Sequence, residues 1–416
     1  MPASESDAPR LRVRSEPLGE APELIDFVTA RDPLVWVRGG SGFAAQGVAH
    51  RIVTGGADRF ASASAAWRHL VERADIDDRA ALPGSGLVAF GSFAFAAASA
   101  EPSVLVVPRQ IVGIRDGAAW STRIWREDEP EPGPAVRTDG TAFGAAPVRF
   151  SDGEQTPDGY VEAVARAIGA IGGGDVAKVV LARDIRGRLG RDADLRPVLL
   201  GLAEGYPKCW TFSVDGLVGS SPETLITVRD GRATARVLAG TASRGADRQS
   251  DQAAAEALAS SVKDQDEHAF AVENVVASLR PHVAALTRSE VPFTLKLPNV
   301  WHLATDVEAT VGDGSDALAL VEALHPTAAV AGTPSAEAVR LIARLEPFDR
   351  GRYSGPVGWI DASGDGEWAI ALRCAAISAD GDIRAYAGCG IVADSDPAHE
   401  LVETRMKFRP IVEAFA

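Results

Sequence analysis

Three charged side chains near the end of the chain have the spacing of one helix face. Glu400, Glu403 and Lys407 are three and four residues apart, so an α-helix would present them together. They follow a Gly-rich run, AGCGIVADSD (387–396), whose backbone N–H groups can bind an anion. Two carboxylates beside an ammonium can hold a hard cation and an anionic ligand together. The alternative is a solvated face with a Glu403–Lys407 ion pair.

A second acidic pair has the same spacing. In SVKDQDEHAF (261–270), Asp264 and Glu267 are three residues apart, with His268 beside them. Mg²⁺ prefers one or two direct carboxylates, with waters and substrate oxygens completing its shell, so two such helices can hold one ion. The alternative is a surface pair between Lys263 and Glu267, and His268 has too few companions to indicate zinc.

Two further residues have the chemistry of a general base and a general acid. Lys178 lies in the apolar run AKVVLARDI (177–185), where a partly desolvated lysine can accept a proton near neutrality. Glu223 follows the turn in GSSPETL (219–225), and a carboxyl buried there can donate a proton. The alternatives are a lysine that extends to water and an acid that binds backbone N–H groups of its turn.

Arg373 and Tyr353 are candidates for binding an anion. Arg373 lies within IALRCAA (370–376), which we predict to be a strand, and a guanidinium among apolar residues is costly unless an anion pairs with it. Tyr353 lies in RYSGPVGWI (352–360). A buried structural ion pair is the alternative for Arg373.

The elements that position these residues fall on both sides of a Pro-, Gly- and acid-rich stretch at 126–157, which indicates a surface loop or linker. Strand-like runs alternate polar with apolar residues, and short Gly/Asp turns such as RDGR and SADGD join several of them. This pattern predicts an α/β protein of the α+β type, with large antiparallel sheets and helices packed outside.

Three local predictions concern the site. We expect one long helix over about 250–285 and one strand over EWAIALRCAAIS (367–378). The last helix is expected to be capped by Asp394 or Ser395, with Pro397 in its first turn.

Residues 40–45, GSGFAA, fit a loose dinucleotide fingerprint, but the sequence continues as a strand, so we predict no nucleotide site there.

Bulk composition excludes several classes of function. The 416 residues carry a net charge of −15, which argues against general nucleic-acid binding and requires local cations or a metal for an anionic substrate. No apolar run is long enough to span a bilayer, and residues 1–12 read as a disordered lead without a signal core. Three distant cysteines, Cys209, Cys374 and Cys389, indicate a reducing compartment, and we predict a cytoplasmic protein.

Taken together, these segments resemble the chorismate-utilising enzymes. The motifs occur in the order of that family: KVVLAR, SSPETL, LAGT, KDxxEH, HPT…GTP (325–334), RYSGPVGW, LRCA and AGCGIVxxSxPxxExxET. The likeness is strong over 155–416, whereas 13–150 matches only as the variable part of the same domain. It implies a single domain over 13–416 in which large antiparallel sheets sandwich the active site.

The resemblance also implies roles for individual residues. Lys178 would be the general base and Glu223 the general acid. Glu267 and Glu403 would bind Mg²⁺ directly, and Asp264 and Glu400 would hold its waters. The residues implied in binding chorismate are Arg373, Tyr353, Lys407, Gly240, Thr241, His302, Gly388 and Gly390. On this view Lys407 is a substrate ligand rather than the ion-pair partner of Glu403.

Members of this family differ in the nucleophile that they use. In the family that this chain resembles, some aminodeoxychorismate synthases carry a nucleophilic lysine in the motif that corresponds to LAGT. This chain has Ala239 at that place, so a covalent lysine adduct is not expected. The LLES and Arg-Asn-Asp stretches typical of anthranilate synthases are absent. The chain therefore resembles the branch in which water attacks chorismate, the isochorismate synthases, with salicylate synthases as the alternative. This branch implies no obligate amidotransferase, a monomer or homodimer, and a pathway to menaquinone or a siderophore.

Overall fold

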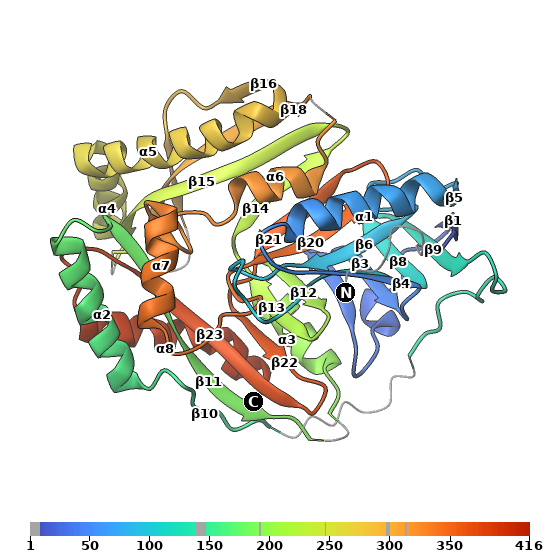
Figure 1. Cartoon of the computed structure of the whole chain (residues 1–416), viewed down its shortest axis with the longest axis horizontal. Helices are drawn as coiled ribbons and strands as arrows, with labels where there is room; N and C mark the ends of the chain where they lie inside the picture. Colours follow the sequence, from blue (N-terminus) through green and yellow to red (C-terminus); the bar gives the residue numbers. More distant parts are fainter. Residues whose placement is uncertain (1–8, 139–146, 191–192, 246, 297–299, 313) are drawn as a thin grey trace.

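Two large β-sheets form the framework of the protein, which is described by a computed structural model. The structure describes residues 9–138, 147–190, 193–245, 247–296, 300–312 and 314–416. Strand pairs in these ranges are antiparallel, except that β1 and β5 are parallel. The predicted architecture of large antiparallel sheets with helices outside is confirmed (Figure 1).

Sheet A has 13 strands within the described ranges. In spatial order these are β10 (Ser151–Asp152), β11 (Lys178–Arg188), β23 (Asp382–Ile391), β22 (Cys374–Ile377), β13 (Leu217–Ser221), β12 (Trp210–Val214), β2 (Leu34–Arg38), β3 (Ser41–Gln46), β8 (Gln110–Arg115), β9 (Ala118–Arg126), β1 (Leu11–Leu18) and β5 (Asp75–Asp78), with β19 (Gly332–Thr333) beside β11.

Sheet B has ten strands within the same ranges. In spatial order these are β16 (Val283–Arg288), β18 (Val300–Val311), β15 (Arg232–Ser243), β14 (Thr224–Arg229), β21 (Gly366–Ile370), β20 (Pro356–Asp361), β6 (Val88–Ser92), β7 (Ser103–Val107) and β4 (His50–Thr54), with β17 (Phe293–Lys296) beside β18.

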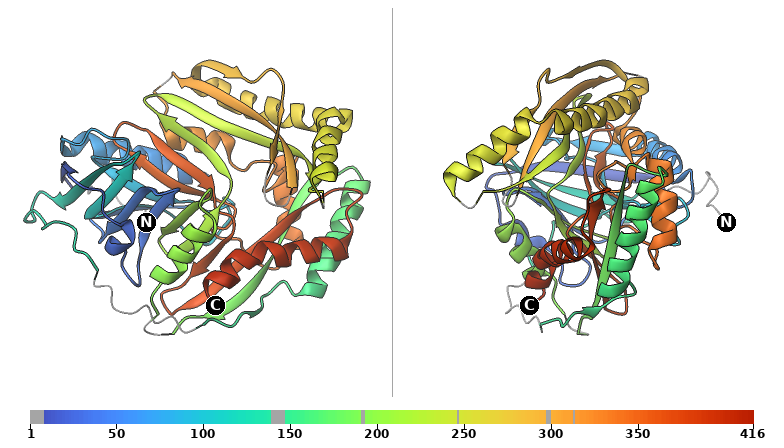
Figure 2. Two further views of the ribbon diagram at one scale, coloured as in Figure 1. Left: turned by 180° about the vertical axis from the view of Figure 1, so that it is seen from behind. Right: turned by 90° about the vertical axis from the view of Figure 1, so that its left-hand side faces the viewer.

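Helices cover the outer faces of the two sheets (Figure 2). Those against sheet A are α2 (Pro157–Gly172), α3 (Arg196–Gly205), α7 (Ser335–Leu345) and α8 (Pro397–Ala414). Those against sheet B are α1 (Arg59–Arg73), α4 (Arg248–Ser260), α5 (Val262–Leu279) and α6 (Ala317–Leu324). Short 3₁₀ turns span Leu24–Phe27 and Arg280–His282.

Aromatic side chains join the two sheets. Phe43 of β3 meets Phe90 of β6 and Trp359 of β20 edge to face, with ring centroids 6.1 Å and 5.2 Å apart. A buried ion pair also crosses between the sheets here, because Arg115 of β8 donates to Glu367 of β21 at 2.9 Å. This ion pair therefore ties sheet A to sheet B.

The catalytic elements predicted from periodicity are largely confirmed, with two corrections. The long helix over 250–285 is in fact two helices, because Ser261 ends α4 and caps α5 by accepting a hydrogen bond from Asp264 N. The single strand over 367–378 is broken into β21 and β22, because Arg373 adopts a left-handed backbone with φ +48°. Arg373 therefore lies in a turn and not inside a strand.

The structure also bears on two predictions near the N-terminus, the disordered lead over residues 1–12 and the absence of a nucleotide site at 40–45. Residues 1–8 of the predicted disordered lead lie outside the described residues, but β1 already includes Leu11 and Arg12. Residues 41–46 form strand β3 where a dinucleotide fingerprint would need a helix, which agrees with our rejection of that motif.

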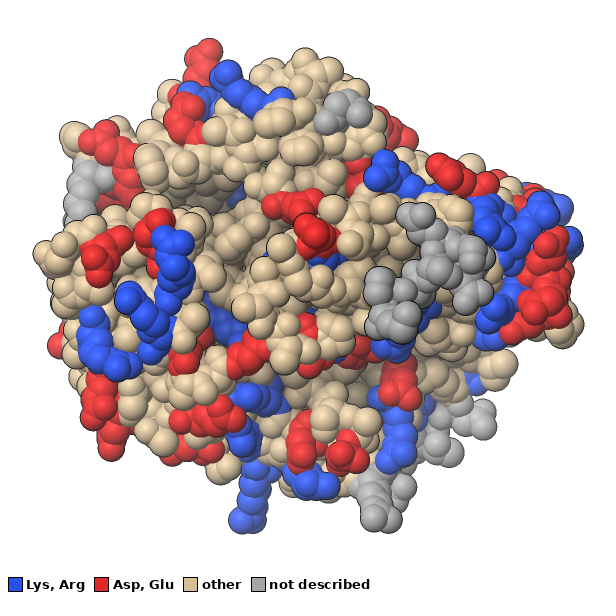
Figure 3. Space-filling view, viewed as in Figure 1, with Lys and Arg blue, Asp and Glu red and all other residues tan. Residues whose placement is uncertain are grey.

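The charges of the chain are mixed on the face shown in Figure 3, where acidic and basic side chains are interspersed. Such a surface does not present the continuous basic stripe that nucleic-acid-binding proteins use. No helix in the described ranges combines the length and apolar character needed to cross a membrane.

Candidate active site

Lys178 is the first residue of β11 and is partly buried. The β-branched and apolar residues that follow it are buried in sheet A, so the predicted strand is confirmed. The side chain of Lys178 crosses Gly390 of the neighbouring strand, because a Cβ at Gly390 would lie 2.8 Å from Lys178 Cε. A glycine at this position leaves room for the lysine at the Gly-rich end of β23.

Glu223 lies immediately before β14, and its backbone is bonded on both sides. Its N–H donates to Ser221 Oγ at 3.2 Å, and its carbonyl accepts from Ile370 N at 3.0 Å. Burial raises the pKa of the Glu223 carboxyl above its ordinary value, and the nearby charges of Arg373, Lys178 and Lys407 oppose this rise only in part. A carboxyl held in this way can remain protonated as a general acid.

The predicted base, Lys178, lies near enough to the predicted acid, Glu223, for its charge to act on the Glu223 carboxyl. Lys178 and Lys407 both act on the pKa of Glu223, and both also lower the pKa of His302. The main cause of the low pKa of His302 is its burial, and its Nδ1 lies 3.3 Å from Gly240 O. At neutral pH His302 is therefore an uncharged ring.

The backbone around Gly240 is irregular for a structural reason. Gly240 has φ +74° and sits at a bulge in the β15–β18 pairing, with Thr241 opposite His302. A Cβ at Gly240 would lie 3.3 Å from Asp264 Cβ, so the strand packs closely on the first turn of α5. The backbone of Thr241 is described, but its side chain lies outside the described set.

His268 fixes the position of α5, a role that the sequence did not reveal. The ring is buried, with Nδ1 3.1 Å from Ala239 O and Nε2 2.7 Å from Thr305 Oγ1. These contacts reach two adjacent strands, β15 and β18. His268 therefore holds the helix that carries Asp264 and Glu267 against sheet B.

Tyr353 is almost completely buried. Its side chain is 3% exposed and its ring stacks on Tyr386 of β23, with centroids 4.8 Å apart. Burial raises the pKa of Tyr353 to about 12, so its hydroxyl keeps its proton and can donate a hydrogen bond. The substrate-binding roles of Tyr353 and Arg373 remain predictions.

Lys407 of α8 joins its helix to the Gly-rich strand. Its Nζ lies 2.8 Å from Gly388 O and 2.6 Å from Glu403 Oε1. The Glu403–Lys407 ion pair, the alternative to a substrate-ligand role for Lys407, is thus present in this structure. Gly388 allows close strand packing, because a Cβ there would lie 2.5 Å from Leu181 O.

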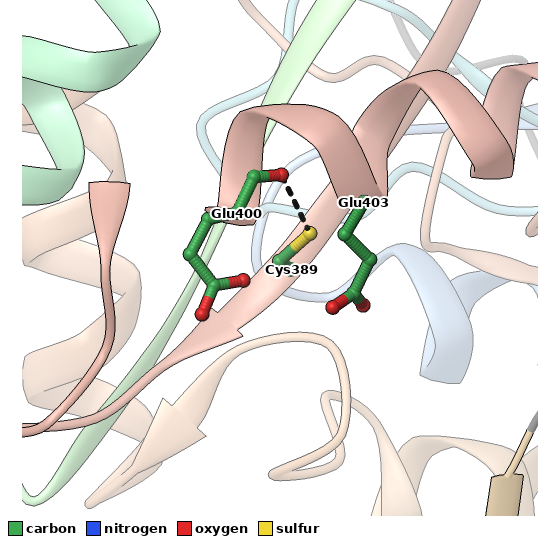
Figure 4. A group of neighbouring side chains, drawn as sticks. All are labelled: Cys389, Glu400 and Glu403. Carbon is green, nitrogen blue, oxygen red and sulfur yellow. Dashed lines mark hydrogen bonds between the residues drawn. The ribbon is translucent and has the colours of Figure 1, made fainter. Parts of the chain in front are cut away.

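Two carboxylates of α8 and one thiol form a compact group (Figure 4). The ligand atoms of Cys389, Glu400 and Glu403 all lie within 4.8 Å of one another. Burial raises the pKa of the Cys389 thiol to about 12, so it stays neutral and is a poor ligand for a hard cation. The two carboxylates are the pair that suits Mg²⁺, which fits the donor set predicted from the sequence.

The acids of α8 are held differently. Glu400 is buried and accepts from Ser395 Oγ at 2.9 Å, whereas Glu403 is partly exposed. Burial favours a raised pKa for Glu403, but the Lys407 ammonium outweighs it and keeps that pKa below its ordinary value. The cap of α8 is Asp396, which accepts from His399 N at 2.7 Å, and not Asp394 or Ser395 as predicted.

The acids of α5 lie outside this compact group, as far as the described residues show. Ser261 Oγ donates to Asp264 Oδ2, and Glu267 is exposed to solvent. The structure therefore brings together half of the predicted metal shell. The participation of Asp264 and Glu267 stays a prediction.

Comparison with known proteins identifies the family. A family model described as chorismate binding enzyme matches residues 36–416. The chain belongs to this family. The predicted resemblance is therefore confirmed, and the protein is an enzyme of the chorismate binding family.

Several of its relatives are isochorismate synthases. The chain is 38% identical to isochorismate synthase DhbC of Bacillus subtilis over 270 residues, which are 62% of this chain and 68% of that protein. It is 36% identical to the putative isochorismate synthase MenF of Mycobacterium tuberculosis over 329 residues, 76% of this chain and 83% of that protein. The crystal structure of a putative 2,3-dihydroxybenzoate-specific isochorismate synthase, DhbC of Bacillus anthracis, superimposes with a TM-score of 0.71 at 30% identity, covering 92% of this chain and 96% of that one.

Proposed function

We propose that this chorismate binding enzyme catalyses the reversible, Mg²⁺-dependent conversion of chorismate into isochorismate. The observation that carries the proposal is that Lys178 lies near enough to Glu223 for its charge to act on the Glu223 carboxyl. The chain is also a chorismate binding enzyme with isochorismate synthases among its relatives. A base and an acid placed together are what the addition of water at one ring carbon and the loss of hydroxyl from another require.

The reaction assigns one proton transfer to each residue. Lys178 takes a proton from the water whose oxygen forms a bond to C2 of the ring. Glu223 gives a proton to the C4 hydroxyl as its C–O bond breaks, so that a water molecule leaves and the ring double bonds shift. One water enters and one leaves, and proton exchange with solvent restores the amine and the carboxylic acid. The raised pKa of Glu223 supports its role as the acid.

Substrate binding needs local positive charge, because chorismate is a dicarboxylate and the chain has a net charge of −15. Arg373 and Lys407 supply cations next to Glu223, and Tyr353 supplies a neutral hydroxyl. The backbone N–H groups near Gly240, Thr241, Gly388 and Gly390 complete the proposed contacts to the carboxylates.

The proposed metal ligands are Glu403 and Glu267, with Glu400 and Asp264 holding metal-bound waters. Mg²⁺, when bound, supplies positive charge that stabilises the ring carboxylate as charge develops during the reaction. The buried Glu400, fixed by Ser395, is suited to orienting a water rather than to moving toward an ion.

The proposal extends to the setting of the enzyme. We place the activity in one domain over 13–416 that is cytoplasmic and acts without an amidotransferase. Because water is the nucleophile, no ammonia-supplying partner is required for turnover.

Incubation of the purified protein with chorismate and Mg²⁺, followed by chromatography, tests this function. The expected product is isochorismate, formed reversibly and without release of pyruvate. Salicylate together with pyruvate would assign the protein to the salicylate synthases instead. Absence of turnover by the metal-loaded protein would contradict the proposal.

A further inference from the structure

One edge of β11 is only partly covered by other strands. Along its other edge β11 pairs with β23 from Val179 to Arg188. On the partly covered edge, β19 pairs with Lys178 and Val179, and β10 pairs with Ile185 and Arg186. Between these two short strands, the backbone of β11 needs other hydrogen-bond partners, since buried peptide groups are rarely left unpaired.

At the start of this interval Val180 N donates to Ala331 O at 2.9 Å, and two side chains bind the backbone groups that follow. Arg350 donates through NH2 to Val180 O at 2.8 Å, and Glu346 Oε1 accepts from Ala182 N at 2.8 Å. The two side chains also bind each other, with Arg350 Nε 2.9 Å from Glu346 Oε2 and NH2 2.6 Å from Oε1. Their side chains are only 2% and 1% exposed, so this two-point ion pair is buried.

Arg350 also contacts the other segments that surround the site. Its NH1 donates to Val330 O at 2.9 Å, in the segment that leads into β19. Its carbonyl accepts from Tyr353 N at 3.0 Å, and its guanidinium lies 5.8 Å from the centre of the Tyr353 ring. Arg350 therefore links β11 and the approach to β19 through its side chain, and the turn that carries Tyr353 through its carbonyl and its guanidinium.

We propose that Glu346 and Arg350 are positioning residues that hold β11 so that Lys178 points at the substrate, and that hold Tyr353 beside it. This inference rests on the proposed function, in which Lys178 is the general base. Val180 is two residues from Lys178, and strand residues two apart point to the same face. A shift of β11 at Val180 is thus passed on to Lys178, and small misplacements of a catalytic group are costly.

The alternative is that the Glu346–Arg350 ion pair only stabilises the folded core. Glu367 provides a matched control, since its side chain is 1% exposed and is paired with Arg115 at 2.9 Å between the two sheets. It also accepts hydrogen bonds from Trp36 and Trp359, so it is equally embedded in the structure. Glu346→Gln and Glu367→Gln should both lower the melting temperature, because each leaves a buried arginine without its counter-ion.

The two variants are expected to differ in kinetics, measured at a temperature where both are folded. Glu346→Gln should lower kcat by about 10- to 100-fold while KM for chorismate changes less than about threefold. Glu367→Gln should keep kcat within about twofold of wild type. Wild-type kcat in Glu346→Gln, despite a lowered melting temperature, would overturn the positioning role.

Arg350→Lys gives a second variant that keeps the charge next to Glu346. A single ammonium cannot reach Val180 O and Val330 O with the fork geometry of a guanidinium, so kcat should fall although the charge remains. In Arg350→Ala, added ethylguanidinium should restore part of kcat and ethylammonium should not. Equal rescue by both cations, or wild-type kcat in Arg350→Lys, would contradict the proposal.

Amide hydrogen exchange separates this inference from the proposed function. Glu346→Gln should increase exchange at residues 180–184, whereas Glu367→Gln should leave that segment protected. This measurement does not depend on turnover. If the wild-type protein fails to convert chorismate, the proposed function falls, and unchanged protection of 180–184 in Glu346→Gln would overturn the positioning of β11 as well.

Discussion

Lys407 and Glu403 form an ion pair of 2.6 Å on the face of α8 that also carries the candidate metal ligands. The same ammonium donates to Gly388 O at 2.8 Å, which ties the helix to the Gly-rich strand. Glu403 is therefore both the proposed metal ligand and the counter-ion of Lys407. Because one carboxylate would serve both cations, we expect metal binding and the ion pair to compete for it.

This competition predicts opposite effects of Lys407→Met on the two ligands. Mg²⁺ affinity in the absence of substrate should rise by up to about fivefold, since a half-exposed ion pair contributes at most about 1 kcal/mol. KM for chorismate should rise, because a cation for the substrate is lost. Calorimetric titration with Mg²⁺ and steady-state kinetics measure the two effects. Arg409→Met is the control, since Arg409 pairs with Glu413 at the exposed end of the same helix; weaker Mg²⁺ binding in Lys407→Met would contradict the prediction.

The role of Lys178 as base predicts a loss of turnover without a loss of binding. Lys178→Ala should lower kcat by about 10²- to 10⁴-fold, the usual contribution of a general base. KM should change little, because the candidate carboxylate contacts belong to other residues. Lys208→Ala removes an exposed lysine and serves as the control. Unchanged kcat in Lys178→Ala would remove this residue from the mechanism.

The raised pKa of Glu223 predicts the alkaline side of the pH profile. A general acid must be protonated, and burial keeps Glu223 protonated to a higher pH than an ordinary glutamate. kcat should therefore fall as pH rises through the raised pKa of Glu223. Arg373→Met should move this loss to higher pH, since Arg373 opposes the rise. Glu223→Gln should lower kcat by about 10²- to 10⁴-fold and abolish this pH dependence.

Kinetics over a range of pH for wild type, Arg373→Met and Glu223→Gln provide the check. Glu204→Gln, at an exposed position on α3, is the control for the loss of one carboxylate. An alkaline loss of kcat that persists unchanged in Glu223→Gln would assign it to another group.

The sequence predicted those parts of the site that depend on local pattern. The apolar run after Lys178 predicted β11, and the i, i+3, i+7 spacing placed Glu400, Glu403 and Lys407 on one face of α8. The ordered family motifs supplied the pairing of distant segments, which no local pattern contains.

The sequence failed where the geometry depends on contacts far apart in the chain. Arg373 has apolar neighbours and no Gly or Pro beside it, so its left-handed turn had no local signal. Ser261 ends one helix and starts the next, although helical periodicity continues through it. Glu346 and Arg350 have the spacing of a surface pair, and only the fold buries them against β11.

A buried carboxyl outside the site predicts how stability depends on pH. Burial raises the pKa of Asp361 to about 6, while its Oδ1 accepts from Ser363 N at 2.9 Å and Asp365 N at 3.1 Å. Between about pH 4 and pH 6 the folded protein thus keeps a proton that the unfolded chain has released. The contribution of Asp361 to the free energy of unfolding therefore falls as pH rises from about 4 to 7. Asp361→Asn keeps the accepting oxygen and cannot ionise. The free energy of unfolding of the variant, relative to wild type, should therefore rise by on the order of 1–3 kcal/mol between pH 4.5 and 7.5.

Urea unfolding at the two pH values measures this difference. Buried histidines with lowered pKa values change stability with pH in the opposite direction. Their contribution is the same in the variant and in wild type, so it cancels in the difference between the two. Asp382→Asn, at an exposed position, should show no such change. A stability difference for Asp361→Asn that is the same at both pH values would contradict the prediction.

Gly240 allows the effect of backbone strain to be separated from that of packing on α5. Its φ is +74°, and a Cβ would lie 3.3 Å from Asp264 Cβ. Gly231, on the turn before β15, has φ +70° but no atom within 4 Å of the same position. Alanine at either site should cost about 1 kcal/mol of folding free energy from the left-handed backbone.

Gly240→Ala should have an additional effect that Gly231→Ala lacks. The added methyl group would press on the first turn of α5 and displace Asp264, one of the proposed metal-shell acids. Mg²⁺ affinity should therefore fall in Gly240→Ala and stay at the wild-type level in Gly231→Ala, although both lose similar stability. Calorimetric titration with Mg²⁺ alongside urea unfolding measures both quantities. Equal Mg²⁺ affinity in the two variants would show that the position of α5 does not matter for the metal, and Asp264 would then leave the proposed shell.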